Sequence, residues 1–156
     1  MKEEMLLKDR IKGFDIFTGL SPDELEKIIP LCQICNFNAD DIIVEEEAIG
    51  TALYIILEGR LEVEMRTPQP QMPENANKHI ATRKAGEIFG VMSFIRKDRT
   101  VARLIAIEKM VVIKIDGDKL NKLFENNNHL GYLVMQNIAL ILDQRLIDLF
   151  FKLRNG

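Results

Sequence analysis

Apolar residues are spaced for helices near both ends of the chain and fall into short, strand-like runs between them. The first group predicts a short amphipathic helix over residues 3–12. Its apolar positions are Met5, Leu6, Leu7 and Ile11.

A second helix is predicted to begin at Ser21. This residue is a favourable N-cap, Pro22 suits the first helical position, and Glu24 completes a capping box. The apolar residues that follow would form the buried face of the helix, and they are Leu25, Ile28, Ile29 and Cys32.

Between residues 34 and 116 the pattern changes to short apolar or alternating runs separated by turn residues. Evenly spaced short strands with glycines at the corners indicate a barrel or a sandwich. Residues 67–78 contain three prolines and are predicted to form a loop. The predicted strands cover residues 34–37, 42–44, 53–57, 61–65, 79–83, 102–107 and 111–115.

Two further helices are predicted after residue 116. The first is short, and three consecutive asparagines separate it from a long helix over residues 129–153. Apolar residues of the long helix alternate at spacings of four and three, as in a coiled-coil seam. A neighbouring apolar stripe could cover the β-structure, whereas the seam requires a partner, most simply a second copy of the chain. The predicted seam comprises Met135, Ala139, Leu142, Leu146, Leu149 and Leu153.

The length of 156 residues indicates a single domain over residues 1–156. Helices would occupy residues 1–33 and 117–154, and β-structure residues 34–116. The net charge of -3 offers no general attraction to nucleic acid. The sequence has neither the layout of a secretion signal at its start nor the ~20-residue apolar run needed to span a bilayer. We therefore expect a cytoplasmic protein that binds neither nucleic acid nor membrane by itself.

Residues that carry chemistry are sparse. Cys32 and Cys35 form one pair, and a zinc site would need two further ligands, for which His79 and His129 are the only histidines. Two small buried thiols are the favoured interpretation. The sequence lacks zinc-protease, serine-hydrolase, P-loop and Rossmann motifs, so it predicts no catalytic residue and no metal site.

The most informative stretch is GEIFGVMSF at residues 86–94, which runs on to RTVA at residues 99–102. Glycines permit close backbone approach, a helix start presents free N–H groups, and an arginine supplies positive charge, a combination suited to a phosphate. The stretch resembles the phosphate-binding cassette of the cyclic nucleotide-binding domain family. The sequence LYIILEGRLEV at residues 53–63 also resembles the central hairpin of that family, and residues 14–25 resemble its entry segment.

The resemblance covers residues 14–153 and implies a mainly β fold. This would be a jelly-roll-like β-roll with flanking helices and a long C-terminal helix, without the DNA-binding domain found in family members that regulate transcription. It also implies a regulatory module whose ligand is a cyclic nucleotide or another small phosphate-bearing molecule. The implied ligand-binding residues are Phe89, Gly90, Val91, Met92, Ser93, Arg99, Thr100 and Val101.

Two positions depart from the family pattern. Val91 occupies the position at which the family has a glutamate that accepts a hydrogen bond from the ribose hydroxyl. The alternation of Ala102, Leu104 and Ala106 then places Thr100 where the phosphate-binding arginine should sit, although a one-residue slip in the loop would bring Arg99 there.

Three interpretations follow from these departures. In the first, the domain binds a cyclic nucleotide weakly or in altered fashion, with Arg99 on the phosphate. In the second, the pocket, which Val91 makes less polar, holds another small anion. In the third, the pocket is degenerate and the β-roll serves as a dimerisation or protein-docking domain. For Arg99 itself, a solvent-exposed side chain in the loop and a role in ligand binding are equally favoured interpretations.

Overall fold

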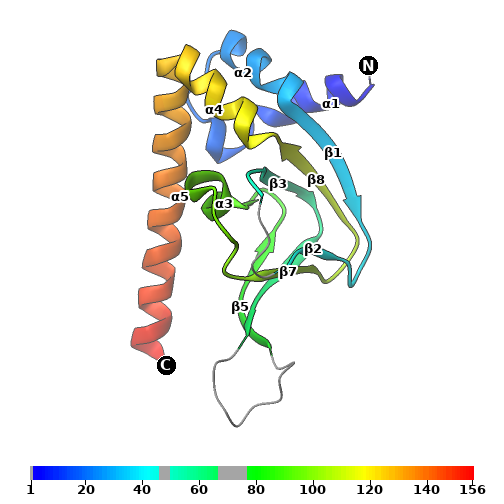
Figure 1. The fold of residues 1–156 in the computed structure, drawn as a ribbon, viewed down its shortest axis with the longest axis vertical. Coiled ribbons are helices and arrows are strands. Elements are labelled where there is room, and N and C mark those ends of the chain that lie inside the picture. Colours follow the sequence, from blue (N-terminus) through cyan, green and yellow to red (C-terminus); the bar gives the residue numbers. More distant parts are fainter. Residues whose placement is uncertain (1, 46–49, 67–76) are drawn as a thin grey trace. The chain divides into compact units, whose positions relative to one another are not determined.

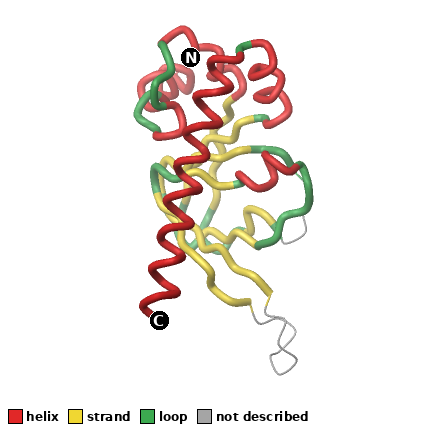
Figure 2. The backbone as a smooth tube through the Cα atoms, turned by 90° about the vertical axis from the view of Figure 1, so that its left-hand side faces the viewer, coloured by secondary structure: helices red, strands yellow, loops and turns green. Residues whose placement is uncertain are grey.

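The computed structural model of the chain describes residues 2–45, 50–66 and 77–156 (Figure 1). The chain divides into two compact units. One combines Met1–Leu31 with Lys119–Gly156, and the other is Cys32–Asp118. Figure 2 shows that the first is helical and that the second contains the strands.

The helical unit follows the predicted elements closely. The predicted capping box is confirmed, because the Ser21 side chain accepts from the Glu24 N–H and the Glu24 side chain accepts from the Ser21 N–H. The long helix begins one residue earlier than predicted and continues to residue 155. The helices are α1 (Lys2–Ile11), η1 (Asp15–Phe17), α2 (Pro22–Ile28), η2 (Ile29–Leu31), α4 (Gly117–Asn126) and α5 (Asn128–Asn155).

The other unit contains two antiparallel four-stranded sheets over the described residues, as the β-roll prediction requires. In one sheet the strand order is β1-β8-β3-β6, and in the other it is β2-β7-β4-β5. A short helix, α3 (Val91–Arg96), follows β6. The strands are β1 (Cys32–Phe37), β2 (Ile42–Val44), β3 (Leu53–Glu58), β4 (Arg60–Arg66), β5 (Asn77–Lys84), β6 (Ile88–Phe89), β7 (Arg103–Ala106) and β8 (Met110–Ile115).

The β3–β4 turn depends on Gly59. Its φ is +91°, a region that residues with a Cβ rarely adopt. A Cβ at this position would also collide with the Lys109 carbonyl oxygen and lie 2.8 Å from the Met110 Cγ. The glycine therefore lets the β3–β4 turn lie directly against the start of β8.

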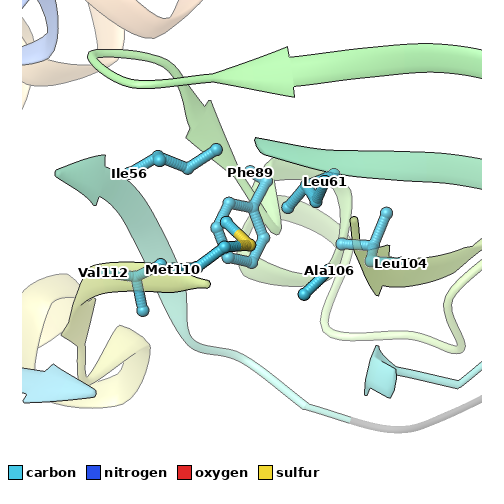
Figure 3. Close-up of a cluster of buried hydrophobic side chains, with 7 residues drawn as sticks. All are labelled: Ile56, Leu61, Phe89, Leu104, Ala106, Met110 and Val112. Carbon is cyan, nitrogen blue, oxygen red and sulfur yellow. The ribbon is translucent and has the colours of Figure 1, made fainter. Parts of the chain in front are cut away.

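Buried side chains from both sheets form the core between them, as Figure 3 shows. Strand β7 contributes Leu104 and Ala106, which confirms the inward alternation predicted for these two residues. Ala102 lies before the strand and is half-buried. The cluster comprises Ile56, Leu61, Phe89, Leu104, Ala106, Met110 and Val112.

Two expectations need correction, and one strand lacked a prediction. Cys32 does not lie on the buried face of α2, because that helix ends at Ile28 and Cys32 opens β1. The predicted loop over residues 67–78 is too long at its end, since β5 begins at Asn77; residues 67–76 lie outside the described part. Strand β6 was not predicted at all. Its two residues are too few to show a periodicity.

Candidate functional site

The predicted cassette is one continuous segment of the β unit. Strand β6 pairs antiparallel with β3, placing Phe89 opposite Tyr54. The turn before β6 is held to the same strand, because the Gly86 N–H donates to the Ile56 carbonyl and the Ile56 N–H donates to the Glu87 carbonyl. Strand β3 therefore sets the position at which the cassette begins.

Gly90 joins β6 to α3 and packs tightly against β3. It is the N-cap of α3 with φ +82°, and its carbonyl accepts from the Phe94 N–H at 3.0 Å. A Cβ at Gly90 would lie 2.7 Å from the Ala52 carbonyl oxygen and 3.2 Å from the Tyr54 ring. The predicted glycine is thus required both by its conformation and by its close contact with the strand.

An aromatic pair supports the start of the cassette. The Tyr54 and Phe89 rings are stacked, with centroids 4.6 Å apart and planes 2° apart. Burial raises the pKa of the Tyr54 hydroxyl, and the nearby Cys35 raises it further. The hydroxyl therefore stays protonated and remains a hydrogen-bond donor at neutral pH.

Helix α3 buries one side and exposes the other. Val91, Ser93 and Phe94 are buried, with Val91 only 4% exposed. Met92 and Ile95 are 58% and 46% exposed. The side chain at the first helical position is therefore buried and carries no polar group.

The loop after α3 carries the candidate phosphate contacts. The Thr100 hydroxyl donates to the Glu45 carbonyl at 2.6 Å. Arg99 is exposed, and its backbone N–H donates to the Asp98 carboxylate at 2.7 Å. Thr100 therefore ties the loop to residue 45, while Arg99 keeps its guanidinium at the surface.

A partly buried ion pair involves Arg103, the first residue of β7, which directly follows the RTVA segment at residues 99–102. Arg103 donates to Glu64 of β4 at 2.7 Å, and the two side chains are 29% and 17% exposed. The Arg103 Nε is buried without a hydrogen-bond partner. The ion pair therefore links Arg103 of β7 to Glu64 of β4 within one sheet.

The structure places the predicted ligand-binding residues along one short stretch, with Phe89 in β6, Gly90 at the cap, three residues in α3 and three in the loop. Sequence reasoning missed two partners of this stretch, Tyr54 and the Glu45 carbonyl. Tyr54 lies in the recognised hairpin, so its register with β6 could have been found had β6 been predicted. A backbone carbonyl that accepts from a distant threonine leaves no sequence signal.

The predicted seam on α5 lies on the helical unit. Met135, Leu146, Leu149 and Leu153 are 38%, 47%, 47% and 79% exposed; Ala139 is also exposed, whereas Leu142 is half-buried. The neighbouring stripe differs, because Val134 and Ile138 are buried. Within the described part of the chain, no helix is both long and apolar enough to cross a membrane.

Comparisons with known proteins agree with this architecture. The family model described as "Cyclic nucleotide-binding domain" matches residues 34–127. Cyclic GMP-binding protein C of Dictyostelium discoideum is 33% identical over 129 residues, which cover 78% of this chain but 5% of that protein. The chain therefore spans about a twentieth of the length of this relative.

Two solved bacterial structures are similar to the chain. A cyclic nucleotide-binding domain from Methylobacillus flagellatus KT has a TM-score of 0.81 at 22% identity, covering 97% of this chain and 82% of that one. A putative cyclic nucleotide-binding protein from Geobacter metallireducens GS-15 has a TM-score of 0.76 at 25% identity, covering 89% of this chain and 97% of that one.

Proposed function

Because this chain belongs to the cyclic nucleotide-binding domain family, we propose that it is a non-enzymatic regulatory module with a diverged cassette that binds ordinary cyclic AMP and cyclic GMP weakly or not at all. The burial of Val91 at the first position of α3 carries this proposal. A valine cannot accept a hydrogen bond from a ribose hydroxyl. A hydroxyl buried against it would remain unsatisfied.

The expected loss of affinity is large. A hydrogen bond to a charged group is worth about 1.5–3 kcal/mol, which corresponds to a roughly ten- to hundredfold change in affinity. Thr100 adds a second deficit, because its hydroxyl already donates to the Glu45 carbonyl. Among the exposed cations of this segment (Arg96, Lys97 and Arg99), Arg99 is the candidate for a phosphate, and its side chain would have to turn toward the ligand from the loop.

Isothermal titration calorimetry with cyclic AMP and cyclic GMP tests the proposal. We expect no binding at micromolar concentrations, and micromolar affinity for either nucleotide would overturn the weak-binding claim. The Arg99→Ala variant tests whether the Arg99 side chain contacts the phosphate. The Lys97→Ala variant, which removes a neighbouring exposed cation, is its control. Weak binding that Arg99→Ala abolishes and Lys97→Ala retains would assign the phosphate contact to Arg99.

A second candidate function is a docking or dimerisation domain with a non-binding pocket. The exposed seam of α5 favours it, since soluble monomers rarely expose long apolar stripes. We propose that the chain forms a homodimer through this helix under either function. Thermal shift with cyclic AMP, cyclic GMP and cyclic dinucleotides separates the two functions, because a ligand at 100 times its Kd adds about 2.7 kcal/mol of stability.

A further inference from the structure

The loop between α3 and β7 presents a hydroxyl group directly after a group of cations (Figure 1). The hydroxyl belongs to Thr100, and no helix or strand element runs through the loop. Val101, which directly follows Thr100, is 48% exposed. Three exposed cations precede Thr100 by four, three and one positions along the chain, and they are Arg96, Lys97 and Arg99.

This stretch is basic, although the whole chain has a net charge of -3. Its three cations are accompanied by a single acid, Asp98. The Asp98 carboxylate accepts a hydrogen bond from the Arg99 backbone N–H at 2.7 Å, so part of its hydrogen-bonding capacity is already used within the loop. A partner that binds this stretch therefore needs an acidic surface.

Thr100 differs from the other serines and threonines in the described part of the chain. Ser93 is buried in α3, and Thr82 lies inside β5. Thr100 alone in that part combines a position in a loop with several cations just before it. The remaining hydroxyl residues have no cation among the five residues that precede them, and they are Thr18, Ser21 and Thr51.

We propose that Thr100 is a phosphorylation site for a protein kinase that selects cations before the acceptor residue. Such a kinase carries acidic side chains in its substrate cleft, and they pair with the cations of an extended segment. The loop meets both requirements without the unfolding of a helix or a strand. Thr100 is half-buried and its hydroxyl donates to the Glu45 carbonyl at 2.6 Å, so the kinase binds the loop after this hydrogen bond opens.

The reaction is a phosphoryl transfer from ATP. The Thr100 Oγ forms a bond to the γ-phosphorus, the bond from that phosphorus to the oxygen bridging the β-phosphate breaks, and ADP leaves. The hydroxyl proton passes to the catalytic aspartate of the kinase. The product is a phosphate ester that carries a charge of about −1.5 to −2 at neutral pH and has three strong acceptor oxygens.

Phosphorylation would change the contacts of the loop. The ester oxygen carries no proton, so it cannot donate to the Glu45 carbonyl, and the loop loses this link to the residue that follows β2. The phosphate oxygens would instead accept hydrogen bonds from the cations that precede Thr100. The modification would therefore release the loop from residue 45 and neutralise its positive charge, whether or not the cassette binds a nucleotide.

Phosphorylation of the full chain in vitro tests the site. The catalytic subunit of cyclic AMP-dependent protein kinase and a calcium- and phospholipid-dependent protein kinase are the probes, because both select cations near the acceptor. We expect fragmentation mass spectrometry to place a phosphate on Thr100 and to find none at this position in Thr100→Val. A casein kinase that selects acidic neighbours should leave Thr100 unmodified.

Substitution of the cations tests why the site is chosen. Arg96→Gln with Lys97→Gln should lower kcat/KM for phosphorylation of Thr100 at least roughly tenfold, because charge-assisted contacts with the kinase are lost. Lys109→Gln with Lys122→Gln removes two other exposed cations and should change it by less than about twofold. The proposal would be overturned by equal effects of the two pairs. It would also be overturned if neither probe kinase modified Thr100 while both modified a peptide standard.

Phosphorus NMR of the phosphorylated chain tests the predicted contact with the cations. A nearby positive charge favours the dianion, so the second pKa of the phosphate should lie below its ordinary value of about 6. Arg99→Gln should raise this pKa toward the ordinary value, whereas Lys109→Gln should leave it unchanged. A phosphate that titrates at the ordinary pKa in the unsubstituted chain would refute neutralisation of the cations by the modification.

Discussion

The Asn137 side-chain amide of α5 donates to the Ile16 carbonyl of η1 at 2.9 Å, and also to the Thr18 carbonyl at 2.9 Å. Asn137 is one of two buried polar or charged residues in the described part of the chain. The amide thus provides a hydrogen-bond donor for one backbone carbonyl within η1 and for one in the residue that follows it. These two hydrogen bonds fix residues 16–18 to α5.

Asn137→Ala should lower the free energy of unfolding by about 1–3 kcal/mol, because the buried Ile16 carbonyl and the part-buried Thr18 carbonyl lose their donor. Urea denaturation of the full chain measures the change. Exposed Gln144→Ala on the same helix is the control and should change stability by less than about 0.5 kcal/mol. Equal effects of the two substitutions would contradict the structural role assigned to Asn137.

Gly90→Ala should destabilise the β unit more than Gly86→Ala. Both glycines have positive φ, at +82° and +91°, and both alanines incur the left-handed cost of roughly 1–2 kcal/mol. Only Gly90 adds a collision, since a Cβ there would lie 2.7 Å from the Ala52 carbonyl oxygen, whereas a Cβ at Gly86 would point into open space. Thermal denaturation compares them, and a larger loss for Gly86→Ala would refute this account of the cassette.

Val91→Glu combined with Thr100→Arg should create or strengthen cyclic-nucleotide affinity. The pair restores the two charged groups that the family resemblance assigns to the ribose and the phosphate. Calorimetry should show a gain of at least roughly tenfold over the unmodified chain. Val91→Gln with Thr100→Gln is the matched control, since it changes size and polarity without charge. No gain from the charged pair would indicate a collapsed cassette.

Leu142→Glu with Leu149→Glu should convert the proposed dimer to a monomer whose β unit remains folded. Burying each leucine is worth ~1.5–3 kcal/mol, and each glutamate would in addition place a charge in the seam. Light scattering reports the mass and circular dichroism the fold. Exposed Asp143→Glu supplies the control. A wild-type chain that is monomeric at high concentration would contradict the prediction.

Acid should weaken the helical unit through Glu24. The Ser21 backbone N–H lowers the pKa of its carboxyl, and a hydrogen bond with His129 at 2.9 Å lowers it further. Because the pKa of Glu24 is lowered in the folded state, its ionised carboxylate stabilises the fold fully above the usual pKa of 4.5. This stabilisation is lost as the pH falls through the pKa of the folded state.

Urea denaturation between pH 6 and pH 3 tests this dependence. The Glu24→Gln variant should lose less stability on acidification than the wild type, whereas Glu26→Gln, whose carboxylate forms an exposed ion pair with Lys8, should behave like the wild type. A wild-type slope that Glu24→Gln leaves unchanged would rule out this carboxylate.

Local signals made much of the fold predictable. The Ser21 capping box, the turn at Gly59 and the alternation of Leu104 with Ala106 each depend on residues close in sequence, and the structure confirms all three. Cys32 was misplaced because a half-buried residue after a helix suits either a last helical turn or a first strand position. Tertiary pairing with Ile115 of β8 decides for the strand.

The candidate site was predictable as a segment but not as a set of contacts. The cassette sequence locates the segment at residues 86–101. However, Gly90 packs against Ala52 and Tyr54, and Thr100 donates a hydrogen bond to the Glu45 carbonyl. Such contacts join positions far apart in sequence, and a backbone carbonyl can belong to any residue type. No pattern of side chains along the chain could have named them.

The packing of Phe94 leaves no room for a side chain at position 117. Phe94 is 1% exposed, and its ring lies 3.1 Å from where a Cβ on Gly117 would stand. Gly117 is the first residue of α4, and a Cβ there would also collide with the backbone of Thr51. Any larger residue at position 117 would therefore have to displace both the Phe94 ring and the backbone at Thr51.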